Sequence, residues 1–467
     1  MARYRSERDG SRTGAPAVDF RFLMTQVLGE PRDRKEPPER LIARRDERVR
    51  SIVRLAFESV PWYRRALRER GIDPGDVATA DDLWILPVVQ HEDLAAEPEA
   101  FLPRGTRIED LLELRTSGST MIPRRIFHDS EGMIAGWAVK LRERAVREAA
   151  CGGRPRRSAS ISMDGNPTAV REHFRVIAPA VWKLIPGRRQ VSVFDDIARV
   201  SEELAEYRPD HLSGYGSAIG RLFRHLAETG VRFPLPRLVT FSSDALAPGE
   251  RRLIEDEFGV PVLGVYGATE AFSIGFECGE GEGYHINEDV SHVRIVDAEG
   301  RDAAEGEPGS LLLSNLVNRG TVLLNYTLGD VAARLAGPCP CGRSLPRIRL
   351  LEGRDATFIE RPGLPPVHQY RLIGPLKELP TSRWQVAQEG PHAFTVRVIP
   401  LGGHDPPSLE AAIHGILRET LGPGLEVRIE YPSDLERTAR GKVPFFVRPR
   451  PASSAAPTPP PASPDRR

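Results

Sequence analysis

Apolar residues recur at helical spacing near the start of the chain. Between residues 39 and 67 they return every three or four positions, and this period predicts an amphipathic helix. Pro61 interrupts the run. Because proline lacks a backbone N–H and clashes with the preceding turn, we expect two helices or one kinked helix here. The apolar stripe consists of Leu41, Val49, Ile52, Val53 and Ala56.

Strand-like and helix-like segments alternate in the middle of the chain. An apolar strand with a polar turn is predicted over residues 233–246, a helix over 248–258 and a short strand over 260–265. This order indicates an α/β architecture with a parallel sheet. A more β-rich section follows, with strands predicted over residues 290–296, 310–316 and 321–326.

The pattern changes after residue 352. Paired strands are predicted over residues 384–388 and 394–400, a helix over 408–421 and a strand over 425–431. Ser408 is the expected N-cap of the helix, because its hydroxyl accepts from the free N–H groups of the first turn. Together these elements predict a small α+β domain of about 100 residues.

The composition is that of a folded protein without a dominant charge. The chain has 467 residues, with 65 Lys and Arg against 65 Asp and Glu, so its net charge favours neither nucleic acid nor an anionic membrane as partner. No apolar stretch approaches the roughly 18–20 residues of a membrane span, and the charged N-terminus lacks an apolar signal core. We expect a cytoplasmic protein with no membrane or nucleic-acid partner. Residues 450–467, rich in Pro, Ala and Ser, are predicted to be a disordered tail.

A first candidate for chemistry is the segment RTSGSTMIPRR, residues 115–125. Small hydroxyl residues around a glycine let several backbone N–H groups turn towards one anion, and the hydroxyls add further donors. Arg124 supplies positive charge for a polyphosphate. The alternative is a Ser/Thr-rich surface turn. The loop residues in question are Thr116, Ser117, Gly118, Ser119 and Thr120.

A second candidate is the segment VLGVYGATE, residues 262–270, in which an apolar strand runs into a polar turn. The carboxyl edge of a strand is where α/β folds bind ligands. Tyr266 offers a flat face to a purine, Gly267 allows close backbone approach, Thr269 can donate to a phosphate, and Glu270 can hold Mg²⁺. The alternative is an ordinary turn with Tyr266 in the core.

Three of the four cysteines form a third constellation with a histidine. Cys278 and His285 are separated by six residues, and Cys339 and Cys341 by one. Thiolates and an imidazole can make a closed tetrahedral zinc site, which would be structural because no ligand position stays open for water. The alternative is free buried cysteines and a surface histidine.

In sequence order, five segments of this chain resemble motifs of the phenylacetate–CoA ligase family of adenylate-forming enzymes. The segments are TSGSTMIP, YGATE, YTLGD at residues 326–330, EGRD at 352–355 and RTARGKVP at 437–444. The first segment departs from the family pattern at Met121, where a glycine is usual, and at Arg124, where a lysine is usual. In the hinge segment the acidic pair is reduced to Asp355, which is followed by Ala356 and Thr357. Some members of the family have a CxCGR element with an upstream Cys and His, which matches the zinc constellation.

The resemblance implies roles for residues to which spacing alone assigns no function. Asp330 would bind the ribose hydroxyls, and Ser243 with Asp244 would form the turn that contacts adenine. Arg354 lies at the hinge between the large and the small domain. Lys442 would reach the acyl carboxylate and the α-phosphate, and Thr269 and Glu270 would share the catalytic site with it.

The resemblance also implies an α/β fold with a large, multi-subdomain N-terminal domain built on parallel sheets, over residues 1–352. A small mobile α+β domain would follow over residues 353–449. A carboxylic acid would react with Mg·ATP to give an acyl-adenylate, which the thiol of coenzyme A then captures. A carrier-protein thiol, or an amine that gives an amide, is the alternative acceptor, and a degenerate nucleotide-binding protein without turnover is the alternative from another class.

The acid pocket is assigned by position to residues 160–166 and 211–217. Met163, Tyr215 and Gly216 are its candidate residues, and they would suit an aryl or mid-sized apolar acid. A homodimer is left open.

Overall fold

The computed structural model describes most of the chain in two compact units. The described residues are 36–115, 124–162, 166–178, 188–244, 246, 248–297, 299–352, 358–361, 364–368, 370–377, 379, 381–400, 405–432, 435, 446 and 447. The first unit holds the described residues up to 352, and the second holds those from 358 onwards. The predicted boundary after residue 352 stays a prediction.

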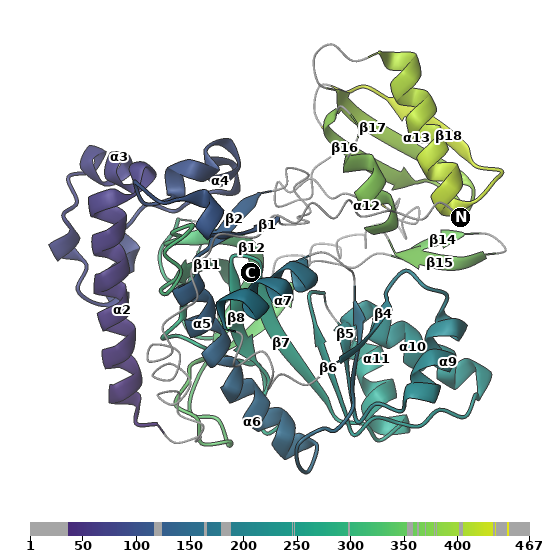
Figure 1. Cartoon of the computed structure of the whole chain (residues 1–467), viewed down its shortest axis with the longest axis horizontal. Helices are drawn as coiled ribbons and strands as arrows, with labels where there is room; N and C mark the ends of the chain where they lie inside the picture. The colour runs from purple at the N-terminus through teal and green to yellow at the C-terminus, as the bar shows by residue number, and fades with distance from the viewer. Residues whose placement is uncertain are drawn as a thin grey trace, which may run out of the picture. The chain divides into compact units, whose positions relative to one another are not determined.

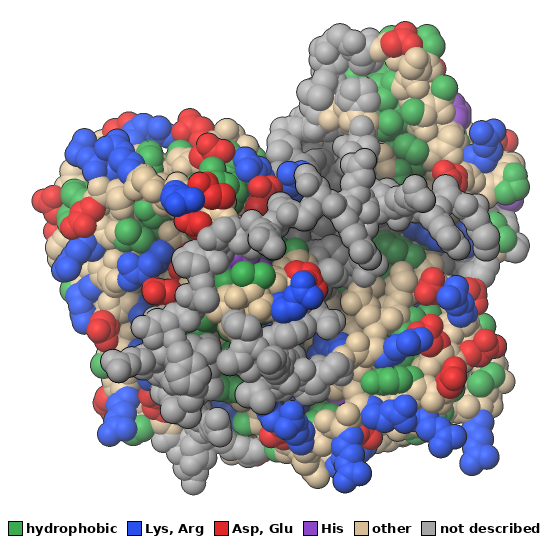
Figure 2. Space-filling view, viewed as in Figure 1, with side chains coloured by type: hydrophobic (Ala, Val, Ile, Leu, Met, Phe, Trp, Pro, Cys, Tyr) green, Lys and Arg blue, Asp and Glu red, His purple; other side chains and the backbone are tan. Residues whose placement is uncertain are grey.

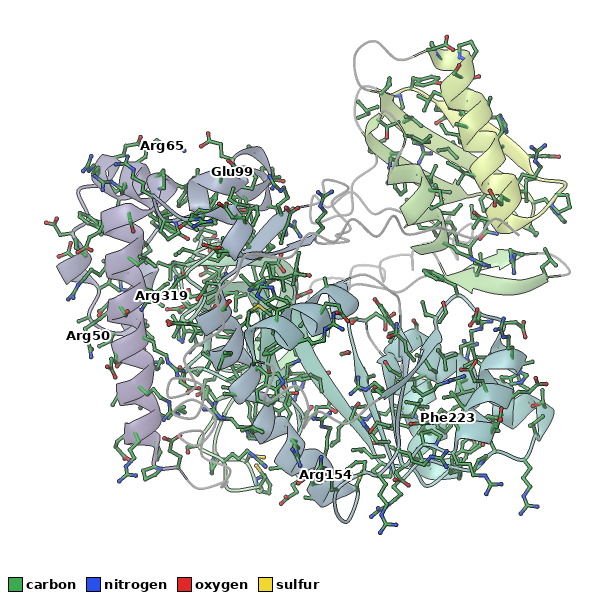
Figure 3. All side chains as sticks on the ribbon, in the orientation of Figure 1. Arg50, Arg65, Glu99, Arg154, Phe223 and Arg319 are labelled. Carbon is green, nitrogen blue, oxygen red and sulfur yellow. The ribbon has the colours of Figure 1, made fainter. Side chains whose placement is uncertain are left out.

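Two helices open the first unit, α2 (Pro38–Ser59) and α3 (Pro61–Glu69). Pro61 is the first residue of α3, and Val60 between the helices is extended, so the sequence correctly predicts a break here. A proline at the first helical position loses no hydrogen bond, because that N–H has no partner inside the helix. Helix α2 also meets a distant segment, since Arg319 donates to Ser51 Oγ at 2.9 Å (Figure 3).

Among the described residues, the first unit is built on one eleven-stranded sheet, in the order β10-β11-β12-β13-β9-β8-β7-β6-β5-β3-β4. The parallel half consists of β3 (Ser158–Ser162), β4 (Arg188–Ser192), β5 (His211–Tyr215), β6 (Leu238–Ser242) and β7 (Val262–Ala268). The antiparallel half consists of β8 (Ala271–Phe276), β9 (Tyr284–Ile286), β10 (Ser291–Val296), β11 (Gly309–Asn315), β12 (Tyr326–Leu335) and β13 (Arg347–Glu352). Strand β7 joins the two halves, because it runs parallel to β6 and antiparallel to β8.

Helices pack beside the parallel half. Figure 1 shows α9 (Ile197–Tyr207), α10 (Gly216–Thr229) and α11 (Pro248–Arg252) grouped beside β4, β5 and β6. Phe223 of α10 is fully buried in their shared core, with its ring 5.2 Å from that of Phe258 (Figure 3). The predicted order of strand, helix and strand is therefore confirmed at β6, α11 and β7.

Shorter elements complete the first unit. A small two-stranded sheet pairs β1 (Leu112–Arg115) with β2 (Arg125–His128). The described part of this unit also contains the α-helices α4 (His91–Ala96), α5 (Ser130–Ala138), α6 (Lys140–Ala150) and α7 (Asn166–Ile177).

The predicted strand over residues 321–326 is wrong, since β12 begins only at Tyr326. Asn325 has a φ of 50°, which ends the extended conformation. The backbone before it bonds to separate partners rather than to one strand: Thr321 N donates to Phe127 O, and Leu324 N donates to the hydroxyl of Tyr63.

The second unit has its own core and a sheet in the order β18-β17-β16-β19. Its elements are β14 (Phe358–Arg361), β15 (Leu364–His368), α12 (Tyr370–Lys377), β16 (Thr381–Gln388), β17 (Ala393–Pro400), α13 (Pro406–Leu421), β18 (Glu426–Glu430) and β19 (Phe446–Val447). The predicted cap is wrong: α13 begins two residues before Ser408, and Asp405 accepts from Ser408 N at 3.2 Å. Pro406 and Pro407 lack an N–H, so the first free donor of the helix is that of Ser408.

Charges of both signs are interspersed over the face that Figure 2 shows, as equal numbers of acidic and basic residues predict. Within the described part of the chain, no helix is both long and apolar enough to cross a membrane.

Candidate active site and metal centre

The YGATE segment forms a tight hairpin between β7 and β8. Ala268 pairs with Ala271, so Thr269 and Glu270 are the two residues of the turn. A Cβ atom at Gly267 would lie 2.7 Å from the carbonyl oxygen of Phe272, and only glycine fits this position. The turn follows the carboxyl end of the strand that joins the two halves of the sheet, where ligands are expected in this class of fold.

Two predicted motifs meet directly at this hairpin. The hydroxyl of Tyr266 donates to Oδ2 of Asp330 at 2.7 Å, which joins YGATE to YTLGD. The Tyr266 side chain belongs to the main core and the residue is 9% exposed, so the alternative reading of a core tyrosine is right about its burial. Its hydroxyl orients the carboxylate that the resemblance assigns to the ribose, while purine stacking stays a prediction.

Glu270 lies in a buried group of polar side chains. Its Oε1 is 3.6 Å from Nη2 of Arg124, and the two side chains are only 1% and 2% exposed. Tyr326 donates to the same Oε1 at 3.3 Å, and Nδ1 of His91 is 2.8 Å from the Tyr326 hydroxyl. The structure thus brings the arginine that follows the predicted phosphate loop to the predicted magnesium carboxylate.

The backbone of the turn is fixed from two further strands. Asn315, at the end of β11, donates to the Glu270 carbonyl at 2.9 Å. Nε2 of His128, at the end of β2, is 2.8 Å from the Thr269 carbonyl. Burial lowers the pKa of His128 to about 4, so at neutral pH its imidazole is uncharged and donates from Nε2.

Sequence reasoning missed both His128 and His91. Each is a single histidine within a short element, and nothing in its local pattern separates it from a core or surface histidine. The one available signal for His128 is its position, four residues after Arg124.

The predicted adenine turn and the predicted acid pocket lie next to each other. Tyr215 pairs with Ser242 at the carboxyl ends of β5 and β6. Gly216 begins α10 directly after Tyr215, and Ser243 follows β6 with a φ of 74°. A sharp turn in the left-handed region places Asp244 against the start of that helix.

Asp244 caps the first turn of α10. It accepts from the Ser217 hydroxyl at 2.6 Å and from the Ser217 backbone at 3.2 Å. A carboxylate is favourable there because it meets unpaired N–H groups and the positive end of the helix dipole. The adenine role of Ser243 and Asp244 and the pocket role of Tyr215 and Gly216 stay predictions.

Eight predicted site residues lie outside the described part of the chain. They are Thr116, Ser117, Gly118, Ser119, Thr120, Met163, Arg354 and Lys442.

Cys278, His285, Cys339 and Cys341 come together in one buried cluster. Their ligand atoms all lie within 4.8 Å of one another, with 3.6 Å between the sulfurs of Cys278 and Cys339 and 3.3 Å between Cys341 Sγ and His285 Nε2. Around a tetrahedral zinc, bond lengths of about 2.0–2.3 Å place neighbouring ligand atoms about 3.5–3.8 Å apart. The residues therefore fit a Cys3His zinc site in number, chemistry and spacing.

The histidine of the cluster is already oriented. Nδ1 of His285 is 3.3 Å from the Leu345 carbonyl, which directs Nε2 towards the sulfurs. Burial lowers the pKa of His285 to about 4, so the ring is neutral, the form that binds a metal. Backbone carbonyls that orient a ligand histidine in this way are a regular feature of zinc sites.

No protein-family model matches the chain, but curated proteins and solved structures do. Phenylacetate–coenzyme A ligase of Thermus thermophilus is 25% identical over 342 residues, 71% of this chain and 74% of that protein. The enzyme of the same name from Aromatoleum evansii is 24% identical over 439 residues, 89% and 96% of the two chains. The chain resembles the phenylacetate–CoA ligases. Its similarity to them extends beyond the five motifs to most of its length.

Solved structures give the fold. 2-Hydroxyisobutyryl-CoA ligase, in complex with 2-HIB-AMP and CoA, matches with a TM-score of 0.58 and 19% identity over 90% of this chain and 92% of that one. The same ligase in the postadenylation state, with 2-HIB-AMP, matches with a TM-score of 0.55 and 18% identity. The predicted fold class, an α/β chain with a separate small α+β unit, is confirmed.

Proposed function

We propose that this protein is an AMP-forming ligase that joins a carboxylic acid to the thiol of coenzyme A. In the first half-reaction the acid's carboxylate attacks the α-phosphorus of ATP, the bond to the β-phosphate oxygen breaks, and pyrophosphate leaves. In the second, the thiol sulfur attacks the acyl carbon, AMP leaves, and the thiol proton passes to solvent. A thioester and AMP are the products.

One observation carries the proposal: three segments far apart in sequence supply neighbouring groups at the β7–β8 hairpin. Arg124 pairs with Glu270 at 3.6 Å, and Tyr266 holds Asp330 at 2.7 Å. In adenylate-forming enzymes these positions serve the polyphosphate, the metal and the ribose. The similarity to curated phenylacetate–CoA ligases supports the same reaction.

The described residues would divide the work as follows. Asp330 would accept from both ribose hydroxyls, since a carboxylate takes two hydrogen bonds at once. Glu270 would hold Mg²⁺, which neutralises charge on the phosphates when bound. Arg124 would place a fixed positive charge beside the polyphosphate. Roles for the 116–120 loop, for Arg354 at the hinge and for Lys442 at the acyl phosphate belong to the proposal and stay predictions.

We also propose that Cys278, His285, Cys339 and Cys341 hold a structural Zn²⁺. All four ligand positions of a tetrahedral ion would be filled by the protein, so no position stays open for water or substrate. The ion would join the segment after β8 to the segment between β12 and β13. The proposal further includes a cytoplasmic location and an aryl or mid-sized apolar acid.

The test mixes purified protein with Mg·ATP, a panel of aryl, fatty and hydroxy acids, and hydroxylamine, and records pyrophosphate release. Release that depends on one class of acid, and that collapses in Lys442→Ala, is the expected result. Mass spectrometry then shows whether added coenzyme A becomes the thioester. Release without thioester formation would favour a carrier protein or an amine as acceptor, and no release despite ATP binding would favour a binding protein.

A further inference from the structure

We propose that His91 is a positioning residue for Glu270 and acts through the hydroxyl of Tyr326. The inference rests on the proposed function, because it takes Glu270 to be the magnesium carboxylate. It adds a residue from α4, an element that none of the recognised motifs includes.

The argument begins with the position of α4 relative to the sheet. Val89, just before the helix, forms a parallel bridge with Tyr326 at the start of β12. Val89 N donates to the Asn325 carbonyl at 3.1 Å, and Thr327 N donates to the Val89 carbonyl at 3.0 Å. These bonds fix the register of the two segments and hold the start of α4 beside Tyr326.

The side chains continue this connection to the active site. Nδ1 of His91 is 2.8 Å from the Tyr326 hydroxyl, and that hydroxyl is 3.3 Å from Glu270 Oε1. Tyr326 is fully buried, and its ring also lies 5.3 Å from the His91 ring in an edge-on arrangement. A tyrosine at this position has little freedom to point elsewhere.

The number of available protons means that His91 decides whether Tyr326 can donate to Glu270. The hydroxyl has one proton, and an ionised carboxylate can only accept. Tyr326 therefore donates to Glu270 only when its own oxygen accepts a hydrogen bond from an Nδ1–H of His91. If Nδ1 lacks a proton, the hydroxyl donates to the histidine at the shorter distance, and of these described partners Glu270 keeps Arg124. Hydrogen bonds in such a chain polarise and strengthen one another.

The consequence concerns the choice of partner for Glu270. Arg124 would compete with a bound Mg²⁺ for the carboxylate, because its guanidinium is 3.6 Å away and buried. Tyr326 approaches the same oxygen and fixes the rotamer of the carboxylate independently of Arg124. Losing the His91 donor should therefore weaken metal binding and leave the acid site unchanged.

The experiment is a double-mutant cycle on the full-length chain. His91→Leu removes the donor, His91→Asn retains an N–H near the position of Nδ1, and Tyr326→Phe removes the hydroxyl but keeps the ring. The control is Glu92→Gln, at an exposed neighbouring position of α4. Mg²⁺ binding is measured by calorimetry with a non-hydrolysable ATP analogue present, and activity is measured as pyrophosphate release at varied Mg²⁺ and varied acid.

We expect His91→Leu and Tyr326→Phe each to weaken Mg²⁺ binding roughly tenfold, the size of one hydrogen bond to a charged group. His91→Asn should stay within about twofold of the unchanged protein, the double variant should be no weaker than Tyr326→Phe alone, and the KM for the acid should not move. Additive losses, or failure of His91→Asn to restore binding, would overturn the proposal. Normal Mg²⁺ binding in His91→Leu or Tyr326→Phe would also overturn it, whether or not turnover falls. An unchanged protein that binds Mg²⁺ with the analogue but releases no pyrophosphate with any acid would count against the proposed function instead, and an unchanged protein that binds no Mg²⁺ with the analogue would overturn both.

Discussion

Tyr266 and Asp330 are joined by a hydrogen bond of 2.7 Å, although 64 positions separate them in the chain. The tyrosine ring is packed in the core of the first unit, so its hydroxyl has a fixed position. Asp330 belongs to β12 and is partly exposed. A rigid donor thus orients a carboxylate that solvent or a ligand can reach, which is the arrangement needed to bind a diol.

The first prediction follows from this pair. Tyr266→Phe should raise the KM for ATP roughly threefold to tenfold, because Asp330 loses the bond that orients it. The ring stays in the core, so the free energy of unfolding should fall by no more than about 1 kcal/mol. Steady-state kinetics at saturating acid provide the measurement. A raised KM for the acid with an unchanged KM for ATP would contradict the assignment of Asp330 to the nucleotide.

Metal content tests the cysteine cluster. The purified protein should contain about one zinc per chain by elemental analysis, and Cys341→Ser should lose it and unfold at a lower temperature, since structural zinc contributes folding energy. The matched control is Cys151→Ser, at a buried cysteine that belongs to a different cluster. It should retain the metal. If the purified unchanged protein contains no zinc, and added zinc does not raise its unfolding temperature, the assignment is wrong.

The buried His128 predicts a dependence of stability on pH. Its pKa is lowered by burial to about 4, whereas an unfolded histidine titrates near about 6.5. The folded state therefore binds a proton less readily, so stability is fully present above about pH 6.5 and is lost as the pH falls towards 4. Protonation of this one group would lower the free energy of unfolding by up to about 3 kcal/mol.

His128→Gln is the variant that isolates this effect. Gln places an N–H close to the position of Nε2, so the bond to the Thr269 carbonyl survives while the titration disappears. Denaturant unfolding between pH 7 and 4 should show a shallower loss of stability than in the unchanged protein. Parallel curves for the two proteins would show that His128 does not titrate in this range.

A buried cluster of ion pairs around Asp289 gives a further prediction for stability. Asp289 accepts from Arg142 at 2.8 and 2.9 Å and from Arg44 at 2.7 Å. Burial alone would raise its pKa, but Arg142 and then Arg44 and Arg48 lower it far below its ordinary value. The stability from this cluster is thus present above about pH 4 and is lost as the pH falls further.

Asp289→Asn should destabilise the protein by about 3–5 kcal/mol at pH 7, because it leaves buried guanidinium groups without their counter-charge. The exposed pair of Arg65 and Glu97, 3.4 Å apart, serves as control. Glu97→Gln should change stability by less than about 1 kcal/mol. An Asp289→Asn effect as small as that of the control would show that the cluster is not coupled to folding.

The sequence predicts local features of this protein well. The break at Pro61 follows from proline chemistry, and the strand that leads into YGATE follows from an apolar run. The grouping of Cys278 with His285, Cys339 and Cys341 follows from residue type. The misplaced strand over residues 321–326 has a physical reason as well. That segment is as apolar as a strand, but its hydrogen bonds go to several unrelated partners, which no local pattern records.

The contacts that define the site are not local. The meeting of Arg124 with Glu270 depends on how β2 and β7 are placed, and the contact of His91 with Tyr326 spans 235 positions. Neither histidine near the turn belongs to a recognisable motif. What the sequence predicts is which segments carry chemistry, and the fold decides which other side chains support them.

The two-residue turn at Thr269 and Glu270 has a wider consequence. Side chains from the ends of β2 and β11 hold its two carbonyls, and none of those anchors lies in the segments assigned to the acid pocket. If the proposed function holds, loops that select the acid can therefore diverge in sequence without moving the carboxylate that we propose to hold Mg²⁺. A protein built in this way could acquire new substrates through changes in the acid pocket alone, while the residues that carry out the reaction keep their positions.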